Sequence, residues 1–109
     1  MSKRQGYQQG DVLILAANAL PENAKPVKAG ARGYVLAEGE VTGHAHVITA
    51  TPDVEMYEDS NGTLWLKVGV ESEVTHEEHH AQTVAPGIYE VRRVVEVDPF
   101  ADEIRAVAD

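Results

Sequence analysis

The chain has 109 residues, of which 43% are hydrophobic and 6% aromatic, and its formal net charge is −9. A chain of this length fits a single domain, spanning residues 1–109, with a mainly aliphatic core. The acidic charge argues against nucleic acid as a partner, because it repels phosphate backbones. The chain has no cysteine, which excludes disulfides, thiol nucleophiles and cysteine-based zinc sites.

Other classes of protein also lack support in the sequence. No Gly-x-Ser-x-Gly elbow and no glycine-rich phosphate loop occurs, so neither a serine hydrolase nor a nucleotide-binding protein is expected. The N-terminal residues have no apolar stretch, and no segment approaches the length of a membrane span. We therefore expect a cytoplasmic protein without a membrane partner.

The first half of the chain has the pattern of short strands. Apolar runs at residues 12–16 and 33–37 are bounded by turn residues and are too short for helices. Residues 18–32, which include prolines and several alanines, are expected to form a loop or a short helical turn. Residues 38–40 predict a tight hairpin connection to a strand over residues 41–49, which carries the first histidines.

A second hairpin is predicted over residues 54–58 and 63–70. The sequence Asp59-Ser60-Asn61-Gly62 between these runs is typical of a turn, with Asn61 and Gly62 supplying positive φ angles. Alternate positions in the second strand predict one core-facing row, made of Leu64, Leu66, Val68 and Val70.

The last third of the chain changes its pattern twice. Residues 71–85 lose the alternation and are expected to form a polar loop or a single helical turn. Residues 88–97 then predict a long strand, which ends at Asp98-Pro99, and residues 103–107 predict a final one. The expected core row of the long strand contains Tyr89, Val91, Val95 and Val97. Arg93 is the charged exception on that face, and we expect its side chain to extend to the rim of the sheet.

About seven short strands with closely spaced turns predict an all-β protein. The expected architecture is a small single-domain β-barrel or sandwich.

All five histidines lie within one 37-residue window, and imidazole is the commonest metal ligand in proteins. On a strand, residues two apart point to the same side at a spacing of about 7 Å, so His44 and His46 can hold one ion. Residues on the opposite side are mainly apolar, namely Val41, Gly43, Ala45 and Val47. The two imidazoles are therefore expected to face solvent or a polar cleft.

The second histidine group can complete the site. His76 lies three residues before His79 and four before His80, and either spacing places two rings on one face of a helical turn. Three imidazoles with a water make an open catalytic zinc site, whereas four protein ligands make a closed structural one. Glu77 and Glu78 are candidates for a carboxylate ligand or, in an open site, for the catalytic general base.

Two motifs carry a resemblance to a known family. They are Gly-Glu-Val-Thr-Gly-His-Ala-His at residues 39–46 and Val-Thr-His-Glu-Glu-His at residues 74–79. With them the chain resembles a family of small uncharacterised bacterial and phage proteins, and residues 10–14 and 86–89 share the likeness. The resemblance implies that both histidine groups belong to one fold, and it implies no activity.

A more distant likeness concerns the chemistry of the site alone. The His-x-His pair with a later histidine resembles the metal site of cupins, which are small β-barrels with a glutamate shortly after the pair. Ala50 and Thr51 stand here where that glutamate is expected. The likeness therefore extends to the imidazole ligands only.

Two functions of different classes follow from the sequence. The first is a protein that binds a divalent transition metal, zinc, through His44, His46 and one or two of His76, His79 and His80, with hydrolytic activity if the site is open. The second is a structural or interaction protein, such as a phage-associated component, that forms a homo-oligomer. In this case the histidines stabilise a loop or a contact between subunits.

Overall fold

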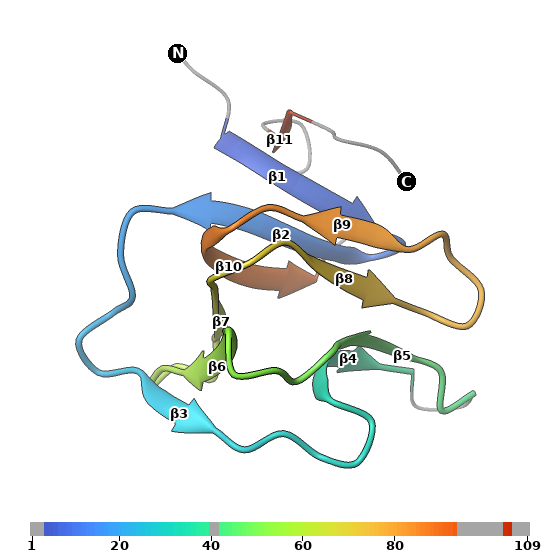
Figure 1. Ribbon diagram of the computed structural model, residues 1–109, viewed down its shortest axis with the longest axis horizontal. Coiled ribbons are helices and arrows are strands. Elements are labelled where there is room, and N and C mark those ends of the chain that lie inside the picture. Colours follow the sequence, from blue (N-terminus) through green and yellow to red (C-terminus); the bar gives the residue numbers. More distant parts are fainter. Residues whose placement is uncertain (1–3, 40–41, 94–103, 106–109) are drawn as a thin grey trace.

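The computed structural model describes residues 4–39, 42–93 and 104–105, and this part of the chain consists of strands and connecting loops (Figure 1). The expected all-β class is confirmed, with more and shorter strands than the sequence predicts. In chain order they are β1 (Arg4–Gln9), β2 (Val12–Ala17), β3 (Lys25–Val27), β4 (Tyr34–Glu38), β5 (Ala45–Ile48), β6 (Val54–Glu58), β7 (Leu64–Val68), β8 (Ser72–Thr75), β9 (Gln82–Val84), β10 (Gly87–Arg93) and β11 (Ile104–Arg105).

The strands form two sheets. One has seven strands in the order β11-β1-β2-β10-β7-β6-β3, and the other has four in the order β4-β5-β8-β9. Neighbouring strands are antiparallel, apart from β11, which pairs with β1 in the parallel direction. Two separate sheets with a shared core make a sandwich rather than a closed barrel.

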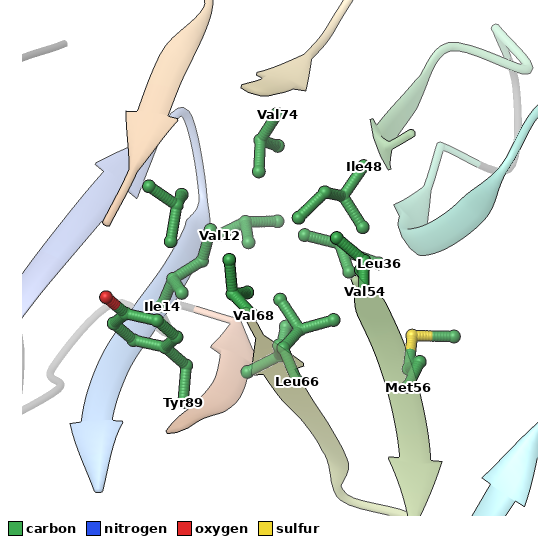
Figure 2. Packing of buried hydrophobic residues seen from close by; sticks show 12 residues of the cluster. Val12, Ile14, Leu36, Ile48, Val54, Met56, Leu66, Val68, Val74 and Tyr89 are labelled. Atoms are coloured by element: carbon green, nitrogen blue, oxygen red, sulfur yellow. The ribbon is translucent and has the colours of Figure 1, made fainter. Parts of the chain in front are cut away.

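The core lies between the sheets. Alternate residues of the large sheet, among them Val12, Ile14 and Leu66, point toward side chains of the small sheet such as Ile48 and Val74 (Figure 2). All of these side chains are fully buried. Strand β2 is buried on both faces, because Leu13 and Leu15 alternate with the core residues and are also inaccessible.

The predicted hairpin forms from β6 and β7, with Val54 opposite Val68 and Glu58 opposite Leu64. Gly62 has the expected positive φ angle of 83°, whereas Asn61 does not. The prediction for Val70 is wrong: its side chain is 47% exposed. The cause is that β7 ends at Val68, and the chain then turns away as the Gly69 amide donates to the Asp53 carbonyl at 2.7 Å.

Residues 71–85 form a hairpin, β8 and β9, and not the expected loop or helical turn. Each strand is so short that it contributes only one or two buried side chains, which are Val74 in β8 and Gln82 and Val84 in β9. Alternation over so few residues gives too weak a pattern to detect. The second histidine group does lie in a loop, at residues 76–81 between these strands.

Two other connections differ from expectation. Residues 18–32 contain the edge strand β3, where Pro26 is tolerated because one side of an edge strand needs no hydrogen bonds. The link between β4 and β5 spans residues 39–44 instead of a tight turn. Within this link the Gly39 amide donates to the His44 carbonyl at 2.9 Å. Because β5 begins at Ala45, His44 precedes the strand.

Part of the predicted structure lies outside the described residues. This applies to residues 40 and 41, to the end of the long strand after Arg93, to the Asp98-Pro99 turn and to most of residues 103–107. In the ranges that the structure describes there is no helix with the length and hydropathy that a membrane span requires.

Candidate metal centre

Four imidazoles from the small sheet form one cluster. The His76 ring is central, with ring centroids 4.3 Å from His46, 4.7 Å from His79 and 5.8 Å from His44. His46 and His79 are stacked at 5.9 Å. The cluster forms because β5 and β8 are hydrogen-bonded neighbours, so the start of β5 lies beside the loop that leaves β8.

His46 is the innermost ring and is 5% exposed. By alternation its side chain shares a face with Ile48, which is a core residue, so the prediction that the core side of this strand is the opposite one is wrong. Ala45 and Val47 point the other way and line an open hollow of about 320 Å³ with Arg32 and Thr75. This error arose because both faces of β5 are buried, which removes the alternation from the sequence.

Gln9 fixes the tautomer of His46. The Gln9 Nε2 donates to the carbonyls of Val74 at 3.0 Å and His80 at 2.8 Å, which orients the amide. Its Oε1 therefore faces the His46 Nδ1 at 2.8 Å, and because Oε1 only accepts, Nδ1 must carry the proton. The lone pair of neutral His46 is then on Nε2.

Burial, reinforced by the neighbouring His76, lowers the pKa of His46 below its usual value of 6.5. The negative charge of Asp11 opposes this shift without cancelling it. The ring is therefore neutral at pH 7, which is the form that binds a metal.

Asp11 and Arg93 come from the large sheet and lie beside the histidine cluster. The Asp11 Oδ1 lies 3.5 Å from the His46 Nε2, and Oδ2 accepts from the Arg93 Nη2 at 2.8 Å. Burial opposes ionisation of Asp11, but the hydrogen bond and charge of Arg93 outweigh it, so the pKa of Asp11 lies below 3.8. The Arg93 side chain thus pairs with an exposed acid.

His44 and His76 are both held by Glu78. The His44 Nδ1 lies 3.2 Å from the Glu78 Oε1, a contact in which the ring donates and Nε2 keeps its lone pair. The Glu78 amide donates to the His76 Nδ1 at 3.0 Å, so His76 has its lone pair on Nδ1 when neutral. In many proteins a carboxylate that accepts from an imidazole, as Glu78 does from His44, orients that ring as a metal ligand.

Glu77 faces outward, and both of its oxygens have partners. Oε1 accepts from the Ala45 amide at 2.9 Å, and Oε2 lies 3.0 Å from an Arg32 nitrogen. The hydrogen bond from Ala45 is the main reason that the pKa of Glu77 is lowered. Ligand atoms of Glu77, His44 and His76 still lie within 4.8 Å of one another, close enough to share one ion.

His79 rests on the turn between β1 and β2. Gly10 in that turn has a φ angle of 57°, which favours glycine, and a Cβ at this position would lie 2.6 Å from the His79 Nε2. Because Gly10 has no side chain, the His79 ring can pack against the backbone of this turn. A hollow of about 230 Å³ extends from here over the cluster, lined by Asp11, Gly39, Thr42, His44, His46, His76, Glu78, His79 and Arg93.

The structure thus brings together the rings of four predicted ligands: His44, His46, His76 and His79. The His80 side chain is exposed and takes part in none of these ring contacts, although its carbonyl holds Gln9. The sequence did not indicate Gln9, Asp11 or Arg32. Only Asp11 carried a signal, since it follows Gly10, but that pair is equally typical of an ordinary turn.

The architecture is an all-β sandwich with a histidine cluster where the two sheets meet. The chain belongs to a family of unknown function: the model of the Domain of unknown function (DUF8820) matches residues 8–94, which include every residue of the cluster. Comparison with curated proteins and with solved structures gives no match. The expected membership of an uncharacterised family is confirmed.

Proposed function

We propose that the protein binds a divalent transition metal, zinc, in the hollow formed by His44, His46, His76 and His79. The observation that carries this proposal is the convergence of four imidazoles from two chain segments, in which the rings in contact have centroids 4.3–5.9 Å apart. A purely structural role would not require so many titratable rings in mutual contact. Imidazole is also the ligand that zinc and its neighbours among the transition metals share.

The hydrogen bonds around the rings support this assignment. Gln9 and Glu78 each accept a hydrogen bond from the Nδ1 of one ring, His46 and His44 respectively, and this leaves the Nε2 lone pair of each ring available to a metal. His76 offers Nδ1, whose lone pair now accepts from the Glu78 amide, so metal binding through His76 displaces that amide. The net charge of −9 further favours a cation.

The hollow supports a hydrolytic role for the bound metal. Its volume of about 230 Å³ leaves space for a water and a small substrate group beside an ion. Glu78 is the better placed general base, since it uses one oxygen on His44, whereas both oxygens of Glu77 are engaged. The absence of cysteine accords with a cytoplasmic location, where disulfides do not form.

Metal titration of protein made without a histidine tag tests the proposal. We expect one zinc per chain in calorimetry, and we expect His44→Ala, His46→Ala and His76→Ala to lower the affinity by about tenfold or more each. His80→Ala is the matched control, because it removes an exposed imidazole of the same loop outside the ring cluster. An absence of zinc binding, or an equal loss in His80→Ala, contradicts the proposal.

The oligomer hypothesis makes a different prediction for the same variants. If the histidines serve a contact between subunits, the variants alter the mass in sedimentation experiments and leave metal content unchanged. Sedimentation of the same samples therefore separates the two functions.

A further inference from the structure

Asp11 borders the hollow that the four imidazoles line. It occupies the turn between β1 and β2 and reaches the cluster from the large sheet, whereas all four rings come from the small sheet. Its carboxylate lines the same hollow as the rings, and Oδ1 is 3.5 Å from the His46 Nε2.

The two facing atoms are both electron-pair donors. The Gln9 Oε1 accepts a hydrogen bond from the His46 Nδ1, so the Nε2 lone pair of this tautomer faces a carboxylate oxygen. Two such atoms repel each other unless a cation or a proton lies between them. A cation bound between the two atoms would be held by both.

The distance between these atoms fits a shared metal ion. Zinc binds imidazole nitrogen at about 2.0–2.1 Å and carboxylate oxygen at about 2.0–2.2 Å, and a tetrahedral angle then separates the two ligand atoms by about 3.4 Å. The observed separation between His46 Nε2 and Asp11 Oδ1 is 3.5 Å. The separation therefore matches the one that a shared zinc ion would set.

We propose that Asp11 is a carboxylate ligand of the metal, bound through Oδ1 and paired with the Nε2 of His46. This inference rests on the proposed metal-binding function and adds a ligand from the other sheet. Mixed nitrogen and oxygen ligands suit zinc and other divalent first-row metals.

Arg93 acts in this arrangement as a positioning residue. Its Nε and Nη2 both donate to the Asp11 Oδ2, at 3.2 and 2.8 Å, which turns Oδ1 toward His46. Carboxylate ligands are commonly fixed by such outer hydrogen bonds, and their loss lowers metal affinity by about 10–100-fold. We expect Arg93→Gln to weaken metal binding within that range while the ligand atoms stay the same.

Cobalt spectroscopy of Asp11→Cys tests the inference directly. The natural chain has no cysteine, so a thiolate-to-cobalt charge-transfer band in the near ultraviolet can come only from the introduced side chain. We expect this band in Asp11→Cys loaded with Co²⁺. The control His80→Cys places a thiol in the same loop as the rings and should give no band.

The possible results separate the two proposals. If the natural protein binds Co²⁺ and Zn²⁺ but Asp11→Cys gives no band and Asp11→Ala keeps the natural zinc affinity, Asp11 is not a ligand and the proposed function stands. If the natural protein binds neither ion, the proposed function fails and the inference fails with it. The band in Asp11→Cys, together with an affinity loss of about 100-fold in Asp11→Ala, supports both.

Discussion

His46 couples the stability of the protein to pH. Burial and His76 hold its pKa below 6.5, so the folded state binds fewer protons than the unfolded state near that pH. In the metal-free protein the contribution of His46 to stability is complete above about pH 6.5 and is lost as the pH falls toward the lowered pKa.

Urea unfolding in chelator-treated buffers from about pH 8 to about pH 5 measures this dependence. We expect the free energy of unfolding to fall with acidification in the natural protein and to fall less steeply in His46→Gln. His80→Gln serves as the control and should retain the natural slope. Equal slopes in all three proteins would show that another group controls the acid response.

Gly10 is expected to be intolerant of any side chain. Its left-handed backbone disfavours alanine by about 1–2 kcal/mol, and a Cβ would also press on the His79 ring. Gly10→Ala should therefore lower both the free energy of unfolding and the affinity for zinc.

Gly62→Ala is the matched control for this prediction. It has a similar φ angle of 83°, and the nearest atom to a new Cβ lies at an ordinary 3.9 Å and belongs to Glu58, which is not a residue of the cluster. Denaturant unfolding should show a comparable loss of stability, whereas calorimetry should show unchanged zinc affinity. If both variants bind zinc normally, the contact of Gly10 with His79 is unimportant for the site.

The residues of the site were only partly predictable from the sequence. Paired histidines are recognisable because imidazole has few roles besides ligation and proton transfer. Gln9 and Asp11 are not recognisable, since glutamine in a strand and aspartate in a turn are ordinary residues. Their relevance depends on contacts with residues more than thirty positions away, which only the packing of the two sheets creates.

At the level of elements, the β6–β7 hairpin was predictable and the β8–β9 hairpin was not. The first combines a turn sequence with apolar residues at alternate positions on both sides, and these two features indicate a hairpin. The second has a six-residue loop and very few buried side chains, so local sequence does not encode it. It forms because β8 pairs with β5 and places Val74 in the core.

The side chain of Gln9 connects β1 to the β8–β9 hairpin, and its loss should weaken this connection. The residue is fully buried, and its amide has three partners: His46 and the carbonyls of Val74 and His80. Gln9→Leu leaves these groups without a partner, and we expect a loss of about 1–3 kcal/mol in the free energy of unfolding.

Gln8→Leu is the control, because the neighbouring amide makes a single local bond to the Gly10 carbonyl. Its effect on denaturant unfolding should be well below that of Gln9→Leu. Hydrogen exchange should also show faster exchange of β8 and β9 amides in Gln9→Leu. If the two variants are equally stable, Gln9 does not hold the sheets together.

For the whole molecule, the location of the site between the sheets predicts strong stabilisation by metal. An ion bound only by the folded state, at a free concentration of about one hundred times its dissociation constant, adds about 2.7 kcal/mol. In a chain of about this size that raises the melting temperature by about 10 °C or more. Thermal unfolding with zinc and with chelator measures the difference.

His46→Ala should abolish most of this shift, and His80→Ala should retain it. A shift of equal size in His46→Ala means that the ion binds elsewhere, for example to surface carboxylates.

The contact of the β1–β2 turn with the histidine cluster also bears on how the chain folds. Gln9 and Asp11 contact ring nitrogens and carbonyls that lie 35 to 71 positions later in the chain. These contacts can form only after long loops of the chain have closed. If Asp11 is a ligand as proposed, an intermediate with only one sheet formed lacks part of the coordination sphere. The visible spectrum of cobalt added during refolding would then report when the two sheets dock. This signal is independent of the fluorescence of Trp65 in β7.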